Sequence, residues 1–325
     1  MKAVTIHAYG GPEVLRVQEV AKPTVQPNEV LVQVKASGIT TADALMRQGT
    51  PRFARLFLGL RKPKHTITGT GFAGVVVDTG AEVTTFTIGD EVFGETSVSF
   101  GANAEFVAVP DDGIILKKPA FLDFAAASLI CDGPLTSMNF LQNLGELQPG
   151  QRVLINGASG SLGTAAVQLA KQMGAHVTGV CSSKNVELVR SLGADEVIDY
   201  TKTDFTRGSA TYDVIYDTVG KSSFGASKRV LTQKGKYLSP VISIGLLFQM
   251  MGTSIIGSRK ALFDATGLKK PEPLKDMLHQ LLVYMQAGNL KVVIDRQFPF
   301  EQAADAHAYV DSGHKRGNVV LTVEA

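Results

Sequence analysis

The spacing of apolar residues along the chain changes near residue 120. Before that point, short stretches of alternating apolar and polar residues, such as EVLVQVKASG and AEFVAVP, are bounded by Gly, Pro, Asp or Asn. This alternation predicts strands, and the frequent turn residues predict antiparallel connections. We therefore expect residues 1 to about 120 to form an irregular, mostly antiparallel β domain. One short helix is expected over Ala42–Gln48, capped by Thr40 or Thr41.

From Phe121 onward, helical patterns alternate with short apolar runs. The predicted strands are Val153–Asn156, His176–Cys181, Glu196–Asp199, Tyr212–Asp217 and Lys236–Leu238. The predicted helices between them are Thr164–Gln172, Asn185–Leu192 and Phe224–Leu231. A strand–helix–strand rhythm with short connections predicts a parallel sheet covered by helices, which is an α/β fold.

The final part of the chain, residues 263–325, mixes helix and strand patterns again. It contains an amphipathic stretch over Pro273–Gln286, the strand-like stretches LKVVIDRQF and NVVLTV, and the helical stretch FEQAADAHAYVDSG. We expect it to rejoin the first β domain, so that residues 1–120 and 263–325 form one domain and residues 121–262 are inserted. The apolar region Val241–Gly257 is broken by polar residues and glycine, which predicts two buried elements rather than a membrane span.

Composition narrows the class of protein. Hydrophobic residues make up 44% of the chain and charged residues 19%, as in globular proteins with large cores. The formal charge of +2 is spread along the chain, so we expect no nucleic-acid partner. Cys131 and Cys181 form no spaced set, and the N-terminus lacks the apolar core of a signal peptide. These features predict a cytoplasmic protein without disulfides or a membrane anchor.

A glycine-rich turn lies between the first predicted strand and helix of the inserted domain. The helix N-terminus would present N–H groups to anionic oxygens, Gly160 would let the backbone approach a pyrophosphate, and Gly163 would let the helix pack on the strand. Ala158 replaces the first glycine of the G-x-G-x-x-G pattern, and the alternative is a tight turn without a ligand. The predicted cofactor-binding residues here are Ala158, Ser159, Gly160, Ser161, Leu162 and Gly163.

The end of the second strand of this domain distinguishes NADP from NAD. An NAD site normally has an acidic residue there, which accepts from the ribose 2′-hydroxyl. This chain has Ser182, Ser183 and Lys184 instead, which favours a 2′-phosphate and therefore NADP. Tyr200 is a candidate for a further hydroxyl to that phosphate. The alternative for Lys184 and Tyr200 is an ordinary solvated surface position.

Several stretches resemble the medium-chain dehydrogenase/reductases, within them the zinc-independent quinone oxidoreductase branch. The resemblance rests on KAVTIHAYGGPEVLRV, ASGITTADALMRQG, GTGFAGVVVDTG, GASGSLGTAAVQLAKQMGAHV, YDVIYDTVG and AADAHAYVDSGHKRGNVVL. It implies a GroES-like catalytic domain from both chain ends and an inserted Rossmann domain that binds NADP. It also implies NADPH-dependent reduction of quinones or of the C=C bond of α,β-unsaturated carbonyls, often by a homodimer.

The resemblance also bears on zinc. Zinc alcohol dehydrogenases have a catalytic Cys where this chain has Thr40, and a His-Glu pair where it has Thr70 and Gly71. Their four-cysteine loop is replaced by SVSFGANAEF, and the six histidines show no ligand spacing. We therefore expect no metal. Quinone reductases of this branch often have Asn near Thr40 and Glu at Gly71, and these two departures leave the acceptor open.

Further site residues are implied by the same resemblance. Thr40 and Asp43 would line the nicotinamide end of the cleft and are the predicted catalytic residues. The alternative for Asp43 is a helix N-terminal acid stabilised by the helix dipole. The additional predicted cofactor contacts are Thr136, Ser239, Pro240, Val241, Lys315, Arg316 and Asn318. For the last three, the alternative is a surface turn.

The preferred function is reduction of quinones or enones by NADPH, with the proton supplied by solvent because no general acid stands out. Leu56, Phe57 and Phe263 are candidates for setting acceptor size. One alternative is an NADPH-binding structural or regulatory protein with little turnover. Another is reduction of simple ketones or aldehydes, against which the missing zinc ligands argue.

Overall fold

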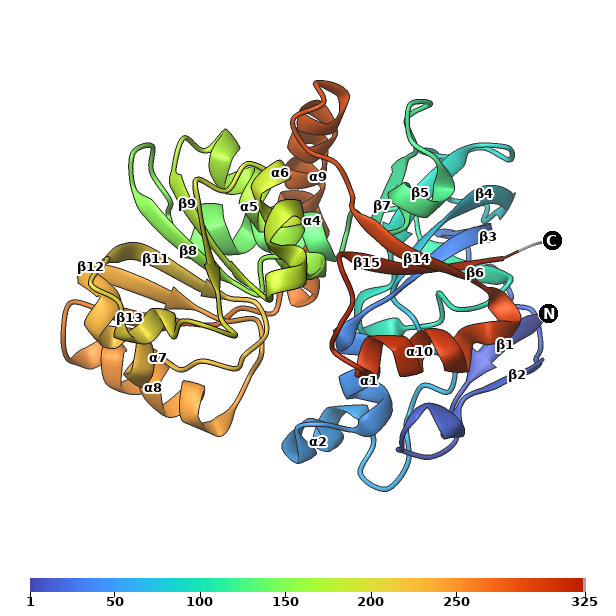
Figure 1. The fold of residues 1–325 in the computed structure, drawn as a ribbon. Coiled ribbons are helices and arrows are strands. Elements are labelled where there is room, and N and C mark those ends of the chain that lie inside the picture. Colours follow the sequence, from blue (N-terminus) through green and yellow to red (C-terminus); the bar gives the residue numbers. More distant parts are fainter. Residues whose placement is uncertain (324–325) are drawn as a thin grey trace. The chain divides into compact units, whose positions relative to one another are not determined.

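A computed structural model describes residues 1–323 of the chain; the last two residues of the predicted segment 263–325 lie outside the described part. The chain forms two compact units (Figure 1). The first, which we call the β unit, comprises Met1–Asp132, Gly267–His279 and the described residues from Ile294 onward. The second, which we call the Rossmann unit, comprises Gly133–Thr266 and Gln280–Val293.

The β unit consists mostly of antiparallel strands. Its strands are β1 (Lys2–Thr5), β2 (Arg16–Glu19), β3 (Glu29–Ile39), β4 (Gly71–Thr79), β5 (Glu91–Glu95), β6 (Phe106–Pro110), β7 (Ile114–Lys117), β14 (Ile294–Pro299) and β15 (Asn318–Thr322). Its helices are α1 (Thr41–Gln48), α2 (Arg55–Leu58), α3 (Phe124–Ala127) and α10 (Ala303–Asp311). Helix α9 (Pro271–Gln286) has residues in both units.

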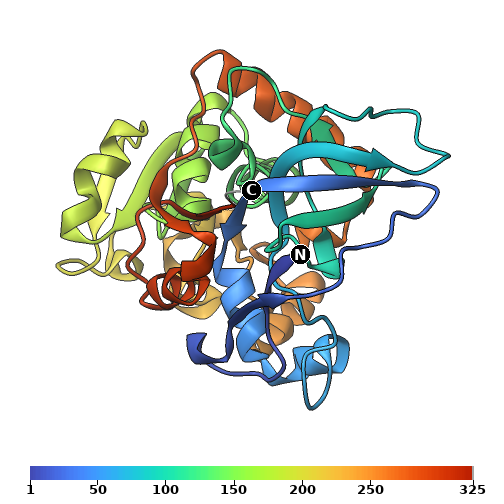
Figure 2. The ribbon, with the colours of Figure 1, turned by 90° about the vertical axis from the view of Figure 1, so that its right-hand side faces the viewer.

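Both ends of the chain build the main sheet of the β unit. Its strand order is β14-β15-β3-β4-β5-β7, and β6 also pairs with β3. Strand β15 runs antiparallel to β3, with Val320 opposite Gly38, and Figure 2 shows these last residues (dark red) beside the blue strand β3. Phe300 and Leu321 from the C-terminal segment share one core with Phe72. The prediction that this segment rejoins the first β domain is confirmed.

The Rossmann unit alternates strands and helices. Its strands are β8 (Arg152–Asn156), β9 (His176–Cys181), β10 (Glu196–Asp199), β11 (Tyr212–Asp217), β12 (Leu231–Leu238) and β13 (Lys260–Leu262). Its helices are α4 (Gly133–Met138), α5 (Ser161–Gln172), α6 (Val186–Ser191), α7 (Phe224–Ser227) and α8 (Ile244–Ile255). Leu154, Ile215 and Tyr237 from three of the strands belong to its buried core.

All neighbouring strands of the Rossmann unit pair in parallel, in the order β10-β9-β8-β11-β12-β13. Numbered along the unit, this order is 3-2-1-4-5-6, the doubly wound order of dinucleotide-binding folds. In such a sheet the strand order reverses beside the first strand, since the second strand lies on one side of it and the fourth on the other. Ligands bind at the carboxyl ends of the strands at this point. The predicted α/β fold is confirmed, and it places the glycine-rich turn after β8 at this edge.

The predicted elements between Phe224 and Gly257 differ from the structure. Strand β12 begins at Leu231, five residues before the predicted start, because α7 ends early at Ser227. The prediction of two buried elements over Val241–Gly257 is wrong, because Ile244–Ile255 forms the single helix α8. Ser243 caps this helix by accepting a hydrogen bond from Leu246 N at 3.1 Å, and most of its apolar side chains are exposed.

The unit boundaries also differ from the predicted ones. Residues 121–132 belong to the β unit, where α3 packs against β3 and β4. Residues 263–266 and 280–293 belong to the Rossmann unit. Gln168 of α5 and Lys291 exchange two hydrogen bonds of 3.0 Å, which tie the second of these segments to the unit. Such long-range contacts are invisible to a pattern of local spacing.

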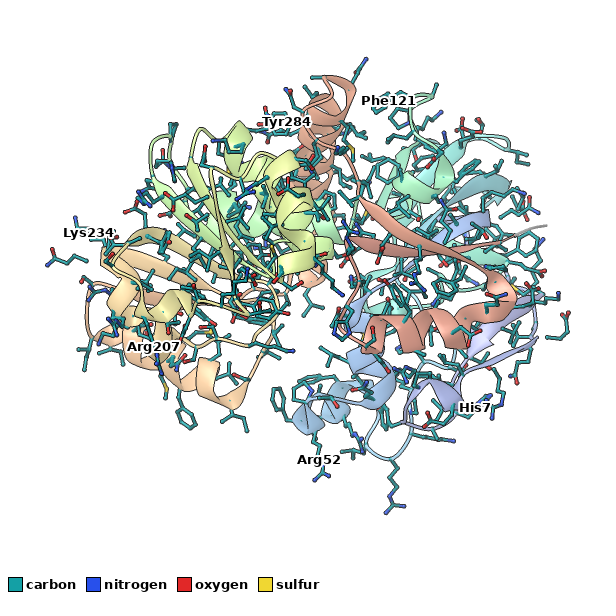
Figure 3. All side chains as sticks on the ribbon, in the orientation of Figure 1. His7, Arg52, Phe121, Arg207, Lys234 and Tyr284 are labelled. Carbon is teal, nitrogen blue, oxygen red and sulfur yellow. The ribbon has the colours of Figure 1, made fainter. Side chains whose placement is uncertain are left out.

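Charged side chains are spread over the surface of both units. Figure 3 shows Arg52, Arg207 and Lys234 pointing away from the ribbon into solvent. Within residues 1–323, no helix combines the length and the apolar character that a membrane crossing requires.

Candidate functional site

The glycine-rich turn leads directly from β8 into α5. Gly157 has φ of +80°, which a residue with a side chain rarely adopts, and it turns the chain away from the sheet. A Cβ atom on Gly163 would lie 2.1 Å from the carbonyl oxygen of Gly157, so this position of α5 requires glycine. The predicted role of Gly163 in close packing of the helix on the strand is therefore confirmed.

Ala158, the departure from the glycine pattern, is accommodated inside the sheet. Its side chain is fully buried, and its backbone N–H donates to Val180 O at 3.0 Å. A Cβ atom on Gly179 of the neighbouring strand would lie 3.1 Å from the Ala158 methyl group. Gly179, which has no side chain, thus leaves room for the methyl group that Ala158 has in place of the glycine of the motif.

Gly160 is the N-cap of α5 and leaves its surroundings open. A Cβ atom there would meet only ordinary contact, with Gly157 O at 3.5 Å. Because glycine has no side chain, it cannot cap the helix, and the N-terminal amides of α5 keep their positive dipole end for an anion. This open cradle fits a pyrophosphate, and the predicted contacts of residues 158–163 with a cofactor stay predictions.

The segment after β9 lies beside the glycine turn. Ser183 and Lys184 are exposed, and Ser182 is half-buried. Asn185, which the sequence analysis missed, is 5% exposed and donates to the side-chain oxygens of Ser159 at 2.9 Å and Ser182 at 3.3 Å. It thereby holds the two predicted phosphate-binding segments together. An amide two residues after a serine pair is too common a pattern to have identified it.

Asp199, at the end of β10, is a second residue that the sequence analysis missed. Its carboxylate accepts hydrogen bonds from Ser183 Oγ at 2.5 Å and from Thr201 Oγ1 at 2.7 Å. These hydrogen bonds lower the pKa of Asp199 to about 2. Tyr200, the next residue, is 60% exposed at the same edge of the sheet. The acid that was absent after the second strand is therefore present after the third.

The loops after β11 and β12 meet at the same edge. Asp217 is fully buried and accepts hydrogen bonds from Asn156 Nδ2 at 2.9 Å and Tyr237 Oη at 2.8 Å, which joins the ends of three strands. A Cβ atom on Gly220 would lie 2.7 Å from the side chain of Val241. The predicted residues Ser239, Pro240 and Val241 therefore lie with the β11 loop at the carboxyl edge of the sheet.

Helix α4 brings Thr136 to the start of α5. The hydroxyl of the adjacent Ser137 donates to Leu162 O at 2.9 Å, and Thr136 is half-buried. The Rossmann unit thus gathers the glycine turn, the segment 182–184 and the loop 239–241 at one edge of its sheet. Contact of Thr136 with a cofactor stays a prediction.

In the β unit, Thr40 and Asp43 form a capping box at the N-terminus of α1. Asp43 Oδ2 accepts from Thr40 N at 2.8 Å and from Thr40 Oγ1 at 2.7 Å, and Asp43 N donates to Thr40 Oγ1 at 3.0 Å. Asp43 therefore has the structural role that was the alternative to catalysis. The single hydroxyl proton of Thr40 is used in this box, and a catalytic role for either residue stays a prediction.

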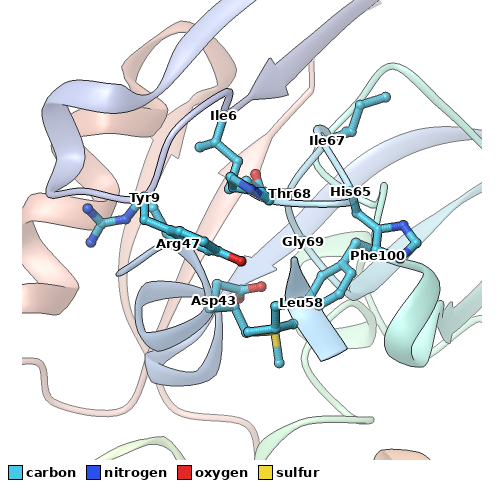
Figure 4. Close-up of a pocket in the computed structure, with 12 residues that line it drawn as sticks. Ile6, Tyr9, Asp43, Arg47, Leu58, His65, Ile67, Thr68, Gly69 and Phe100 are labelled. Atoms are coloured by element: carbon cyan, nitrogen blue, oxygen red, sulfur yellow. The ribbon is translucent and has the colours of Figure 1, made fainter. Parts of the chain in front are cut away.

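Asp43 also lines a small, largely apolar pocket in the β unit (Figure 4). The pocket is lined by Ile6, Tyr9, Asp43, Met46, Arg47, Leu58, Pro63, His65, Ile67, Thr68, Gly69 and Phe100. Leu56 and Phe57, proposed from sequence to set acceptor size, are 69% and 82% exposed on α2. Leu58, one residue further on, lines the pocket instead, and Phe263 belongs to the Rossmann unit.

Three carboxyl groups of the β unit influence one another. Burial raises the pKa of Asp43 to about 6, against the lowering effect of its Thr40 hydrogen bonds. Burial and then the charges of Asp132 and Asp43 raise the pKa of Glu95 to about 8. Glu95 is therefore largely protonated at neutral pH. Burial also raises the pKa of Cys131, so this thiol is an inert core group.

The predicted tail residues lie in the loop between α10 and β15. Lys315 Nζ donates to Gly317 O at 3.2 Å, and Arg316 N donates to Asp295 Oδ2 at 2.7 Å. Arg316 is exposed, whereas Asn318 is 3% exposed at the start of β15. Burial lowers the pKa of Lys315, opposed by nearby carboxylates. These residues belong to the β unit, and their contact with cofactor phosphates stays a prediction.

Gly71 stands where quinone reductases of the branch that the chain resembles often have glutamate. A Cβ atom there would lie 2.7 Å from the backbone oxygen of Ser128, so glutamate cannot occupy this position without displacing α3 from β4. Within residues 1–323, no group of three or more His, Cys, Asp or Glu side chains is arranged to hold a metal ion.

Comparison with known proteins covers both units. Residues 26–120 match the family described as alcohol dehydrogenase GroES-like domain, and residues 192–321 match the family described as zinc-binding dehydrogenase. The chain is 31% identical to the NADPH-dependent alkenal/one oxidoreductase, chloroplastic, of Arabidopsis thaliana over 99% of this chain and 79% of that protein.

Solved structures agree along the full length. The quinone oxidoreductase from Coxiella burnetii superposes with a TM-score of 0.89 at 29% identity, covering 100% of this chain and 99% of that one. The Escherichia coli quinone oxidoreductase complexed with NADPH gives 0.87 at 26% identity, covering 99% and 100%. With the doubly wound sheet and the β unit built from both chain ends, these matches show that the chain belongs to the medium-chain dehydrogenase/reductase superfamily, in the zinc-independent quinone oxidoreductase branch.

Proposed function

We propose that this chain is an NADPH-dependent, zinc-independent reductase of quinones or of the C=C bond of α,β-unsaturated carbonyls. The observation that carries the proposal is the glycine turn at the carboxyl edge of a doubly wound sheet, followed after β9 by a lysine and two serines. Full-length likeness to proteins named as an alkenal/one oxidoreductase and as quinone oxidoreductases supports the choice of acceptor.

The Rossmann unit supplies the groups that would hold the cofactor. NADPH, when bound, supplies the hydride for the reduction. The amides at the start of α5 would bind the pyrophosphate, and Lys184 with Ser182 and Tyr200 would bind the 2′-phosphate. Thr136 and the loop Ser239–Val241 would contact the nicotinamide half.

The apolar pocket beside Asp43 is suited to the body of a quinone or enone. Ile6, Met46, Leu58 and Phe100 give it an apolar lining, and Asp43 at its wall is held by Thr40. Because the Thr40 hydroxyl proton is engaged by Asp43, the proton that completes the reduction comes from solvent in this proposal. The chain's own residues then act by orienting the acceptor and excluding bulk water.

An acceptor panel tests the proposed activity. The purified chain is mixed with NADPH and with benzoquinones, naphthoquinones, enones and 2-alkenals, and the loss of NADPH absorbance is followed. Oxidation of NADPH by at least one class above the enzyme-free rate is expected. NADPH binding without oxidation by any acceptor would contradict the activity and favour a structural or regulatory NADPH-binding protein.

A homodimer is part of the proposal. Strand β13 is the last strand of its sheet, and among the described strands it pairs only with β12. The adjacent helix α8 exposes Ile244, Phe248, Met251 and Ile255, which are 58–79% exposed. An exposed apolar helix face of this kind is suited to a second copy of the chain. A cytoplasmic location is proposed as well, because both cysteines are free thiols.

A further inference from the structure

Asp199 lies where its charge can act on the proposed 2′-phosphate site. In the parallel pairing of β10 with β9, Asp199 is opposite Cys181, the last residue of β9. Both strands end at the same edge, and the segment Ser182–Lys184 begins there. The Asp199 side chain is 14% exposed, whereas residues 200–204 that follow it are exposed.

The hydrogen bonds of Asp199 use the hydroxyl protons of its neighbours. Ser183 Oγ donates to Oδ2 at 2.5 Å, and Thr201 donates to Oδ1 through its hydroxyl at 2.7 Å and its backbone N–H at 3.0 Å. A serine hydroxyl has one proton. While Ser183 donates to Asp199, it has no proton for a phosphate oxygen, contrary to the role predicted for it.

The positive charges beside Asp199 only partly offset it. Lys202 Nζ lies 3.7 Å from Asp199 Oδ2, but its side chain is 74% exposed, and such surface pairs are weak. Lys184, in the segment that follows β9, is exposed as well. The hydroxyl and amide donors lower the pKa of Asp199 to about 2, so it is ionised at neutral pH.

We propose that Asp199 restrains the preference of this site for NADPH over NADH. Its carboxylate repels the two negative charges of a 2′-phosphate and withholds the Ser183 proton from it, whereas NADH carries neither penalty. Lys184 then provides the main attraction for the phosphate. This inference rests on the proposed function, because it assumes that the dinucleotide occupies the edge formed by β8, β9 and β10.

The test measures binding to the full-length chain by calorimetry, with no acceptor present. The ligands are NADPH, NADH and their adenosine halves, adenosine 2′,5′-bisphosphate and adenosine 5′-monophosphate. For Asp199→Asn we expect about three- to tenfold tighter binding of the two 2′-phosphorylated ligands, from loss of one repulsive charge. Binding of the other two ligands should change less than about twofold. The gain should shrink at high salt.

A matched control comes from the same unit. Asp204 accepts from Thr206 N at 2.9 Å and Thr206 Oγ1 at 2.7 Å, as Asp199 does from Thr201, but it has no partner in the segment 182–184. Asp204→Asn should leave all four affinities unchanged. Lys184→Ala should weaken only the 2′-phosphorylated ligands, in the direction opposite to Asp199→Asn.

Three outcomes would overturn the inference. Equal weakening of all four ligands by Asp199→Asn, in a variant with a parental melting curve, would assign Asp199 a purely structural role. An unchanged ratio of NADPH to NADH affinity in both Asp199→Asn and Asp199→Ser, two variants that remove the charge with side chains of different size, would do the same. Failure of the parent chain to bind either dinucleotide would overturn the proposed function, and this inference with it.

Discussion

At the scale of single residues, the capping box of α1 joins stability to the candidate site. Thr40 is 6% exposed and Asp43 is 4% exposed, yet both are polar and Asp43 lines the apolar pocket. Their reciprocal hydrogen bonds satisfy two backbone N–H groups that would otherwise be unpaired at the helix end. The same contacts hold the Asp43 carboxyl group in one orientation at the pocket wall.

Thr40→Ala should remove the cap and free the Asp43 carboxyl group. We expect a loss of about 1 kcal/mol in the free energy of unfolding. For domains of this size, that corresponds to a melting temperature lower by about 2–4 °C. Scanning calorimetry measures it, with Thr40→Ser as the control that keeps the hydroxyl. A Thr40→Ala chain that melts with the parent would show that the box contributes nothing.

Glu95 should make stability depend on pH. Its pKa is raised from 4.5 to about 8 in the folded chain, so between these values the folded state binds more protons than the unfolded state. The free energy of unfolding therefore falls as pH rises through this window. The glutamine in Glu95→Gln cannot ionise, so the variant does not lose this stability. The melting temperature of the variant minus that of the parent should therefore be about 2–4 °C larger at the upper end of the window than at the lower end.

The control for this measurement is Glu82→Gln, which alters an exposed carboxyl group of the same unit. Its melting temperature should follow the parent at every pH. A constant difference between Glu95→Gln and the parent across the window would contradict the raised pKa. The experiment separates ionisation from packing, because a packing defect would shift the melting temperature equally at all pH values.

At the scale of elements, α1 and α10 are joined by an ion pair whose arginine is buried and whose aspartate is open to solvent. Arg47 is fully buried and donates to Asp311 Oδ2 at 2.5 Å and to Gly10 O at 3.0 Å. His307 of α10 is also fully buried, and burial with the nearby Arg47 charge lowers its pKa to about 3. A neutral histidine therefore packs beside the arginine, and Asp311 provides the compensating charge.

Arg47→Met should leave Asp311 without its partner. We expect a loss of about 2 kcal/mol in the free energy of unfolding, since Gly10 O and Asp311 lose hydrogen bonds from a charged donor, although the Asp311 carboxylate left behind is open to solvent. Denaturant unfolding followed by circular dichroism measures the loss. Arg190→Met, which breaks the exposed pair with Glu187, is the matched control and should cost about 0–1 kcal/mol. Equal effects of the two variants would contradict the importance of burial.

Helix α8 provides the prediction for assembly. Its exposed apolar side chains at residues 244, 248, 251 and 255 follow the spacing of one helix face. Phe248→Glu places a charge in the middle of this face and should convert the proposed dimer to monomer, as measured by light scattering coupled to size exclusion. Gln249→Glu adds the same charge outside the face and should leave the assembly unchanged. A parent chain that is monomeric at all concentrations would refute the proposed dimer.

At the scale of the whole molecule, the chain has two units with separate sheets and cores, and a ligand stabilises the unit that it binds. The β unit depends on strands from both chain ends, and the Rossmann unit is a continuous sheet with its own core. A ligand that binds the folded Rossmann unit stabilises it in proportion to its affinity and concentration.

NADPH should therefore raise the melting temperature of the chain. At a concentration 100 times the dissociation constant, the expected stabilisation is about 2.7 kcal/mol. Scanning calorimetry with and without NADPH measures the shift, and an equal concentration of adenosine, which lacks phosphates, is the control. Absence of any shift with NADPH would contradict dinucleotide binding, whichever acceptor the chain uses.

The sequence alone determined the local elements and the course of the chain. Strands β9, β10 and β11 have the predicted bounds to the residue, because short apolar runs bounded by turn residues mark strands of a parallel sheet. The glycine turn and the missing acid after β9 were also evident from spacing, since each depends on residues close together in the chain. The return of the C-terminal segment to the β domain was expected from its mixed strand and helix patterns and from the family resemblance.

Only the tertiary structure decided which residues meet across the sheets. The contact of Ser183 with Asp199 joins residues 16 positions apart and depends on the register of β10 with β9. The apolar composition of α8 predicts burial, but most of its apolar side chains are exposed, because no other segment of the described chain covers them. Burial of Glu95 among other carboxyl groups likewise appears only when separate strands assemble. Local spacing encodes periodicity, whereas charge environment and burial arise from contacts between segments distant in sequence.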